Sequence, residues 1–199
     1  MITDWIIETD FRILNWIQEY LRCEFLDQII PVFTSLGEKG WFFILAAIIM
    51  LCIPKYRKWG LSLGLALLFG LLFGNLLIKN IVARTRPYDM VEEIVLLVNP
   101  LSDYSFPSGH TMAAFEFFAV VCMMPIKKRY KVLAGVLAFT MAFSRLYLYV
   151  HFPSDVLVGM LLGTLFGLMG VFIANKIKGE KSCLHESNEP CAGKEKYVR

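Results

Sequence analysis

The residues best suited to chemistry lie in one short stretch between two apolar segments. Arg145 is followed after five residues by His151, and Asp155 follows His151 after three more. Histidine can act as a nucleophile or proton shuttle near neutral pH, and a carboxylate beside it can fix the imidazole tautomer. Arginine presents a planar fork of donors that suits a phosphate. At a membrane surface, this combination indicates phosphoryl transfer from a lipid.

Two earlier clusters contain further cations and a turn before an apolar segment. Lys79 is followed after six residues by Arg86, and the turn is Pro-Ser-Gly-His at residues 107–110. A phosphomonoester carries about two negative charges near neutral pH, which Lys79, Arg86 and Arg145 together can balance. Taken singly, these cations could instead be interfacial anchors whose charged ends reach toward water. One phosphate site explains all of them at once.

The start of the third apolar segment adds an anion site and a second histidine. Ser108 and Gly109 lie where we expect a helix to begin, so their backbone N–H groups are free to bind an anion. Two histidines can then share the reaction, one attacking phosphorus and the other protonating the leaving oxygen. Because Asp155 can orient His151, we interpret His151 as the nucleophile and His110 as the general acid.

The composition is that of an integral membrane protein. Of the 199 residues, 57% are hydrophobic and 19% are charged, whereas soluble domains are usually about 45–50% apolar and about 25% charged. Residues 59–78 and 156–174 contain no charged side chain, and each run is close to the roughly 20 residues that cross a bilayer core. These features exclude a soluble enzyme and indicate an all-α transmembrane helical bundle.

Hydropathy and helical periodicity predict five transmembrane helices and an amphipathic helix before them. The first predicted span starts near residue 37 or 38 and has its apolar body at 41–53, and the others are residues 59–78, 110–124, 132–147 and 155–174. Residues 4–22 repeat apolar side chains at helical spacing but carry too many charges to span, which favours a position in the membrane interface, with a helix packed across the top of the bundle as the alternative. We therefore divide the chain into interfacial N-terminal helices at 1–36, a transmembrane domain with the three clusters at 37–176 and a disordered tail at 177–199.

Basic residues gather at one side of the predicted bundle. They occupy the turns at 55–58 and 127–131 and the stretch 176–181, which follow the first, third and fifth spans. The positive-inside rule makes that side cytoplasmic. The loop 80–109 and the turn 148–154 then face outward, and the C-terminus is cytoplasmic. We therefore expect the active site at the outer face of a cell membrane.

The cysteines, Glu116 and Arg84 give weaker indications of function than the three clusters. The five cysteines show no metal-ligand spacing or disulfide framework, so we expect no metal site and no cofactor. The composition favours membrane lipids as partners and no nucleic acid. Glu116 lies inside the third span but on another helical face from His110, and we expect an interhelical structural partner for it. Arg84 could contact a second phosphate or a lipid headgroup, or lie solvated in its loop.

The three spaced motifs resemble those of the type 2 phosphatidic acid phosphatase superfamily, also called lipid phosphate phosphatases. The family pattern is Lys, six residues, Arg-Pro; then Pro-Ser-Gly-His; then Ser-Arg, five residues, His, three residues, Asp, and this sequence matches every position. Over residues 37–176, the resemblance implies a helical bundle shared with soluble acid phosphatases and vanadium haloperoxidases. It also implies a metal-independent phosphatase working through a phosphohistidine on His151, with His110 as acid and Asp155 as the partner of His151.

The resemblance further assigns phosphate binding but does not identify the lipid. The phosphate ligands that it implies are Lys79, Arg86, Ser108, Gly109 and Arg145. The compact five-span layout is similar to that of bacterial undecaprenyl diphosphate phosphatases, so we expect a lipid phosphate or diphosphate substrate and, among these, undecaprenyl diphosphate. Phosphatidylglycerophosphate, phosphatidate and lipid A phosphates stay open as substrates. A lipid phosphotransferase and a non-enzymatic lipid-binding or transport bundle stay open as functions.

Overall fold

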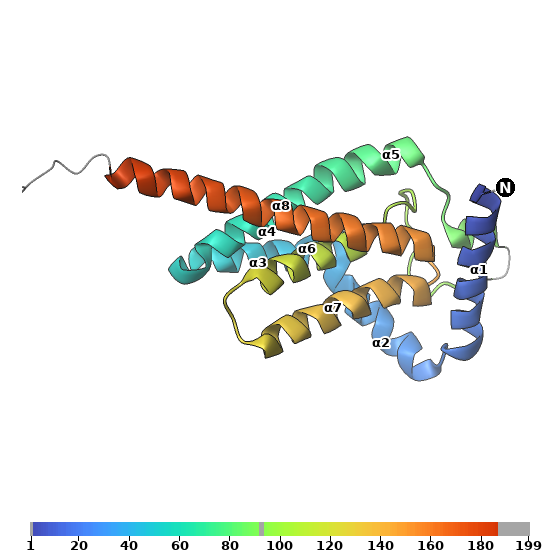
Figure 1. The fold of residues 1–199 in the computed structure, drawn as a ribbon. Helices are drawn as coiled ribbons and strands as arrows, with labels where there is room; N and C mark the ends of the chain where they lie inside the picture. The colour runs from blue at the N-terminus through green and yellow to red at the C-terminus, as the bar shows by residue number, and fades with distance from the viewer. Residues whose placement is uncertain (1, 92–93, 187–199) are drawn as a thin grey trace, which may run out of the picture.

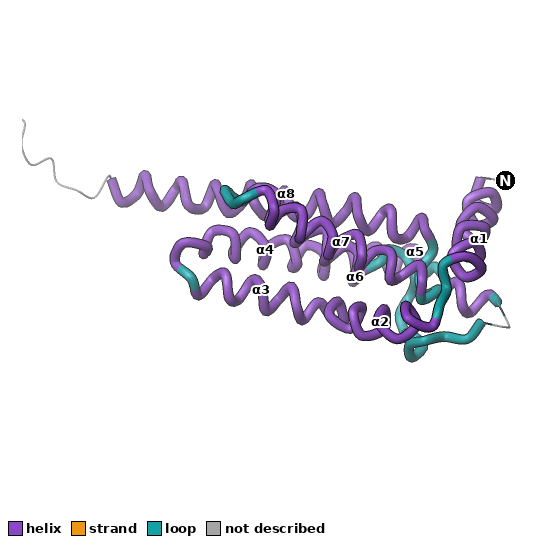
Figure 2. The backbone as a smooth tube through the Cα atoms, turned by 90° about the horizontal axis from the view of Figure 1, so that it is seen from below, coloured by secondary structure: helices purple, strands orange, loops and turns teal. Residues whose placement is uncertain are grey.

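The fold is a bundle of long helices with one helix lying across its end. A computed structural model describes residues 2–91 and 94–186, and over these residues the chain forms helices, turns and loops without a strand. In Figure 1, α8 runs the length of the bundle and α1 crosses one end of it. Figure 2, turned by 90°, places α1 at the same end. The predicted all-α class is confirmed.

The helices follow the predicted segments closely. The N-terminal part contains α1 (Ile2–Tyr20), α2 (Glu24–Thr34) and the 3₁₀ segment η1 (Ser35–Gly40). The bundle contains α3 (Trp41–Cys52), α4 (Arg57–Phe69), the π-helix η3 (Gly70–Ile78), α5 (Lys79–Val82), α6 (Gly109–Met123), α7 (Lys128–Tyr147) and α8 (Pro153–Glu186). Two short 3₁₀ turns, η2 (Pro54–Tyr56) and η4 (Pro87–Met90), complete the described helical elements.

The second predicted span differs in detail from the structure, because its second half is the π-helix η3 rather than an α-helix. Two glycines of η3 lie directly against α6. A side-chain carbon at Gly70 would collide with Glu116, and one at Gly74 would collide with Met112. Hydropathy registers how apolar a segment is but not such a close approach, so the sequence did not predict the π-helix.

The last helix is longer than the predicted span. We expected it to end at residue 174, where the apolar run ends, but α8 continues to Glu186. The first part of the segment expected to be a disordered tail therefore belongs to α8. Residues 187–199 lie outside the described residues. A helix that leaves the hydrocarbon core needs no further apolar side chains, so the apolar run marks the membrane boundary rather than the helix end.

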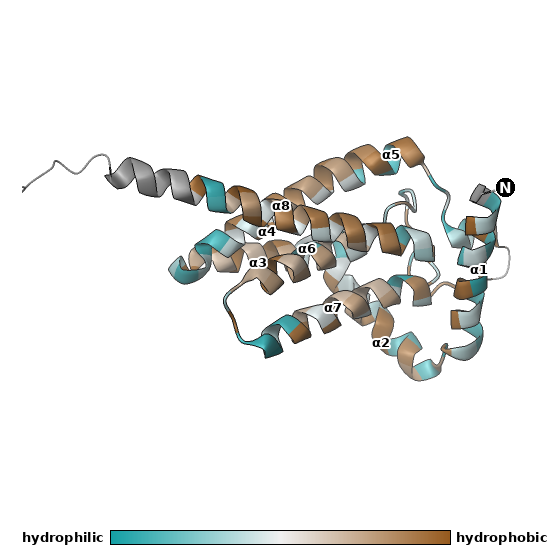
Figure 3. Cartoon of the chain, viewed as in Figure 1, coloured by the Kyte–Doolittle hydropathy of each residue, from teal (hydrophilic) through white to brown (hydrophobic). Residues whose placement is uncertain are grey.

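The outer surface of the bundle is apolar. Within the described part of the chain, three helical stretches are long and apolar enough to cross a membrane, namely Glu24–Cys52, Pro54–Met90 and Pro153–Ile177, and α6 is a shorter apolar helix. Figure 3 shows hydrophobic residues along the bundle helices. Leu161 and Phe172 of α8 are 70% and 71% exposed, as expected where the surrounding solvent is lipid. The protein is therefore membrane-spanning, while the count of five spans stays a prediction.

Helix α6 lies at the centre of the bundle and packs against α8, α7 and α4. The backbones of α6 and α8 approach closely, since a side-chain carbon at Gly163 would collide with the carbonyl oxygen of Met112. Small residues allow such approaches between membrane helices. At the end near α1, the Ser108 N–H donates to the carbonyl oxygen of Asp155 at 3.2 Å. This contact brings the starts of α6 and α8 together.

Helix α1 has one face buried against the bundle and one exposed apolar face. Asp10, Leu14 and Ile17 recur at helical spacing and are buried against the bundle. The exposed apolar face consists of Trp5, Ile6, Ile13, Trp16 and Tyr20. This arrangement agrees with the helix predicted from the sequence, since one face packs on protein and another is left open.

Candidate active site

The three sequence clusters meet at the end of the bundle that α1 crosses. A cavity of about 680 Å³ opens there. The predicted site residues in its wall are Lys79, Arg86, Gly109, His110 and His151. The other three, Ser108, Arg145 and Asp155, are buried behind this wall. The three clusters, which lie far apart in the sequence, therefore supply one site.

His151 lies beside Asp155 and Ser105 at the start of α8. The Nδ1 atom of His151 is 3.7 Å from Oδ2 of Asp155 and 3.5 Å from Oγ of Ser105. The same Oδ2 accepts hydrogen bonds from Ser105 Oγ at 2.5 Å and from the Phe152 N–H at 2.9 Å. The carboxylate is therefore held in one orientation, with one oxygen toward the imidazole.

The turn that carries His151 is fixed by packing and by hydrogen bonds. The Val150 N–H donates to the Arg145 carbonyl oxygen at 3.2 Å. Tyr149 has a left-handed φ of 60°, which is unusual for a bulky side chain and persists only where the surroundings determine it. Its hydroxyl donates to Oδ1 of Asn15 in α1 at 2.7 Å. Helix α1 therefore helps to define the turn.

The surroundings of His151 favour a neutral imidazole whose Nε2 faces the cavity. The pKa of His151 is lowered from 6.5 to about 3, chiefly by burial and also by the charges of Arg86 and Arg145, while the Asp155 carboxylate offsets part of this effect. Nη1 of Arg86 lies 3.3 Å from Nε2. Because a guanidinium only donates, Nε2 must be the acceptor and Nδ1 carries the proton toward Asp155. This tautomer leaves a lone pair available for attack on phosphorus.

Lys79 and Arg86 form a cationic pair around the carboxylate of Asp103. Lys79 Nζ lies 2.5 Å from Oδ2, and Arg86 Nη2 lies 2.6 Å from Oδ1. Arg86 is also fixed by the carbonyl oxygens of Asp103 and Val150, to which it donates at 2.8 and 2.7 Å. Burial alone would raise the pKa of Asp103, but the hydrogen bonds and charges of Lys79 and Arg86 lower it to about 2. An anion therefore already occupies the cationic pair.

Arg145 lies behind the cavity wall and is 2% exposed. Its Nη1 donates to Oγ1 of Thr34 at 2.6 Å, and Ser144 donates to the same hydroxyl at 3.2 Å. Among the described residues, its Nε has no hydrogen-bond partner. A buried arginine with an unpaired N–H group can donate a hydrogen bond to a bound anion.

The start of α6 brings His110 and Gly109 into the cavity, whereas Ser108 points away from it. Ser108 is buried, and its hydroxyl pairs with that of Thr111 at 2.9 Å. The Ser108 N–H is bonded to the Asp155 carbonyl oxygen, so the prediction that this N–H is free to bind an anion needs correction. Gly109 remains in the wall, and a side chain there would contact Oδ1 of Asn75.

Arg84 and Glu116, whose roles the sequence left open, have specific positions in the structure. Arg84 is neither solvated nor in the cavity wall; it forms ion pairs with Asp155 at 2.6 Å and with Asp10 at 2.8 Å. Glu116 is 1% exposed and lies against η3, but its Oε1 has no hydrogen-bond partner among the described residues. The polar interhelical partner expected for Glu116 is therefore absent from that part of the chain.

Sequence reasoning missed four residues that contact the site: Asp10, Thr34, Asp103 and Ser105. None belongs to a spaced motif, and two lie in or beside the N-terminal helices that we assigned to the interface. Within the described residues, no group of three His, Cys, Asp or Glu side chains has the arrangement of a metal site. The site offers cations, two histidines and a carboxylate, which suit phosphate chemistry.

Known proteins share both the motifs and the fold. The model of the PAP2 superfamily matches residues 59–178. The undecaprenyl-diphosphatase of Sulfolobus acidocaldarius is 30% identical over 71% of this chain and 68% of its own length. The crystal structure of Aquifex aeolicus LpxE has a TM-score of 0.72 and 30% identity, covering 81% of this chain and 93% of that one.

A second solved structure agrees with the first. The transmembrane PAP2-type phosphatidylglycerolphosphate phosphatase from Bacillus subtilis has a TM-score of 0.70 and 28% identity, and the match covers 86% of this chain and 87% of that one. Both similarities include the bundle that carries the cavity. Because the family model matches, the fold is shared and the named relatives are similar, this chain belongs to the PAP2 superfamily and is a membrane-embedded lipid phosphate phosphatase.

Proposed function

We propose that this protein hydrolyses a membrane lipid diphosphate, undecaprenyl diphosphate, through a phosphohistidine on His151. The observation that carries the mechanism is the position of the His151 Nε2 atom. It lies 3.3 Å from Arg86 in the wall of a cavity that also contains Lys79 and His110. A phosphate held by the two cations would therefore lie next to the nucleophile and the acid.

In the first half of the reaction, Nε2 of His151 attacks the terminal phosphorus as the bond to the bridging oxygen breaks. His110 gives its proton to that oxygen, so the leaving lipid phosphate departs without extra charge. Asp155 stabilises the positive imidazole that forms. The negative charge on the phosphoryl oxygens is balanced by Lys79, Arg86 and Arg145. Backbone N–H groups at Gly109 donate hydrogen bonds to the same oxygens.

In the second half, water attacks the phosphohistidine. His110, now unprotonated, takes a proton from the water, and the bond between phosphorus and Nε2 breaks. Inorganic phosphate leaves and His151 returns to its neutral form. The phosphate must share the cations with Asp103 or displace it, and the half-exposed position of that side chain allows it to move.

The undecaprenyl substrate is supported by the apolar part of the cavity and by one relative. Away from the histidines the wall consists largely of aliphatic side chains of α3 and α4, among them Ile44, Ile48, Leu67 and Leu68. A hydrocarbon chain needs no hydrogen bonds, so such a wall suits a polyprenyl tail. The Sulfolobus relative is named an undecaprenyl-diphosphatase. Phosphatidylglycerophosphate is the second candidate, because the Bacillus structure carries that name.

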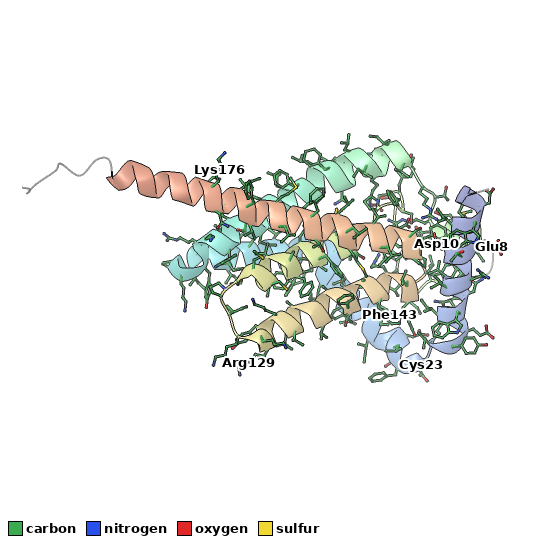
Figure 4. All side chains as sticks on the ribbon, viewed as in Figure 1. Glu8, Asp10, Cys23, Arg129, Phe143 and Lys176 are labelled. Carbon is green, nitrogen blue, oxygen red and sulfur yellow. The ribbon has the colours of Figure 1, made fainter. Side chains whose placement is uncertain are left out.

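We also propose that the cavity opens at the outer face of the cell membrane and that α1 lies in the interface there. Figure 4 shows Arg129 and Lys176 at the end of the bundle away from Asp10, so basic residues and the site lie at opposite ends. The positive-inside rule assigns the basic end to the cytoplasm. The exposed Trp5, Trp16 and Tyr20 of α1 are the residue types that favour the headgroup region.

The test is an assay of the purified protein against undecaprenyl diphosphate, phosphatidylglycerophosphate, phosphatidate and lipid A, with chelator present. We expect release of inorganic phosphate to be fastest from undecaprenyl diphosphate and unaffected by chelation. Faster release from a glycerolipid would contradict the polyprenyl substrate. Transfer of the phosphoryl group to an alcohol without release of phosphate would indicate a phosphotransferase, and loss of turnover in chelator that added metal restores would contradict the mechanism.

A further inference from the structure

Arg84 connects the turn that carries His151 to helix α1. Its Nη1 donates to Oδ1 of Asp155 at 2.6 Å and to Oγ of Ser154 at 2.7 Å. Its Nη2 donates to Oδ2 of Asp10 at 2.8 Å. The guanidinium also stacks on the Phe152 ring, 3.9 Å from its centroid. One side chain therefore contacts the end of the turn, the start of α8 and a helix that is distant in sequence.

Asp10 holds the other side of this network. It is 4% exposed, on the face of α1 that meets the bundle, and Figure 4 shows it there. Its Oδ1 accepts the Ser154 N–H at 3.0 Å and its Oδ2 accepts the Ser154 hydroxyl at 2.5 Å. The first N–H groups of a helix have no partner within it. Asp10 supplies one for α8, so α1 fixes the start of the helix that carries Asp155.

The two oxygens of Asp155 consequently have different partners. Oδ1 is held by Arg84, and Oδ2 is held by Ser105 and the Phe152 N–H while facing His151. The carboxylate is 0% exposed. A buried carboxylate without a cation is strongly unfavourable. Arg84 is the cation that pairs with it directly, and it sets the direction in which Oδ2 points.

Arg84 does not resemble a phosphate ligand. Lys79 and Arg86 lie in the cavity wall, whereas Arg84 is not among the described residues that form it. Two carboxylates, those of Asp10 and Asp155, also neutralise its charge. A group placed in this way acts on the reaction through Asp155 rather than through the substrate.

We propose that Arg84 is a positioning residue for the His151–Asp155 pair, and that Asp10 of α1 holds Arg84 in place. The proposal rests on the proposed role of His151 as nucleophile. It makes α1 part of the catalytic apparatus, because the orientation of the imidazole depends on a salt bridge to that helix. It also assigns Arg84 a role that the spaced motifs do not include.

The test compares Arg84→Ala and Arg84→Lys with Arg22→Ala. Arg22 is the matched control, because it also joins the N-terminal helices to the outer loop, through Asp27 and the Val95 carbonyl oxygen, but lies away from His151. We expect Arg84→Ala to lower kcat by ~10–100-fold without changing KM, by analogy with the loss on removing a group that orients a metal-bound histidine. Arg84→Lys should recover part of kcat, since one ammonium can reach only part of the network. Arg22→Ala should keep the wild-type kcat.

A double mutant separates positioning from a general structural role. If Arg84 acts through Asp155, adding Arg84→Ala to Asp155→Asn lowers kcat no further than Asp155→Asn alone. Independent losses that add, or a higher KM with kcat unchanged, would overturn the proposal. A phosphoenzyme that still forms normally in Arg84→Ala would overturn it as well. A wild-type enzyme that forms no phosphohistidine would instead refute the proposed mechanism, so the two failures are distinguishable.

Asp10→Asn should show a smaller loss of kcat in the same direction as Arg84→Ala, and a wild-type kcat in Asp10→Asn would remove α1 from the proposal.

Discussion

The carboxylate of Asp103 accepts a hydrogen bond from Lys79 inside the candidate phosphate site. Arg86 binds its second oxygen, so the two cations that the sequence assigns to phosphate are already paired with an anion. Because its pKa is lowered to about 2, Asp103 stays ionised throughout the physiological range. A phosphate entering the site meets a resident competitor of the same charge.

We therefore expect Asp103→Asn to bind anions more tightly than the wild type. The amide keeps the size of the side chain but removes the competing charge. KM for the lipid substrate and the inhibition constant for vanadate should both fall. Vanadate is a suitable probe because its five-coordinate form resembles the phosphoryl transition state. Asp89→Asn is the control, since Asp89 lies in the same outer segment and is exposed. A higher inhibition constant in Asp103→Asn would mean that Asp103 organises the cations rather than competes for them.

Stability should depend on pH through His151. The unfolded chain protonates this histidine below about pH 6.5, whereas the folded protein does so only near pH 3. The unfolded state therefore binds more protons between these values, and stability falls as the pH decreases from 6.5. The slope is ~1.4 kcal/mol per pH unit.

The measurement is the melting temperature of the wild type and of His151→Gln in one detergent from pH 7 to pH 4. Glutamine does not titrate, so the wild type should lose more stability than the variant over this range. Asp103 does not interfere, because its contribution is lost only as the pH falls from 3.8 toward 2. Parallel curves for the two proteins would show that His151 is not held neutral.

The orientation in the membrane can be tested with a thiol label that does not cross the bilayer. Asn99 is exposed in the loop between α5 and α6 and lies outside the ion pairs of the site. Asn99→Cys in a cysteine-free background should react in intact cells. Lys128→Cys, in the opposite basic turn, should react only after lysis. The reverse pattern would place the site on the cytoplasmic side.

The sequence predicted the architecture well because the membrane makes hydropathy a reliable guide. The span predicted at 110–124 lies within a residue of α6 (Gly109–Met123) at each end. The first span was predicted to start near residue 37 or 38, and α3 (Trp41–Cys52) begins later, at the start of the apolar body predicted at 41–53. The π-helix η3 was not predicted, because hydropathy does not distinguish a π-helix from an α-helix. The close approach of Gly70 to Glu116 arises only when two helices are packed together.

The candidate site was predicted in part for a related reason. Spacing located the side chains that face the cavity, such as Lys79 and His151, but not the groups that hold them. Arg84 has no special spacing, and its partner Asp10 lies 74 positions away in the sequence. The Ser108 N–H was expected to be free, yet the packing of α6 on α8 gives it a partner. Long-range hydrogen bonds of this kind have no signature in a single sequence.

The central claim assigns different roles to His151 and His110, and the two alanine variants test it most directly. Activity is measured on phosphatidylglycerophosphate, a lipid monophosphate whose alkoxide leaving oxygen needs a proton, and on nitrophenyl phosphate, whose leaving group departs without one. His151→Ala should be inactive on both, because no phosphoenzyme can form. His110→Ala should lose about 10²–10⁴-fold on the lipid and keep measurable activity on the activated ester. Asp155→Asn should fall between these variants. If His151→Ala still hydrolysed the activated ester while His110→Ala did not, the assignment of the nucleophile would be wrong.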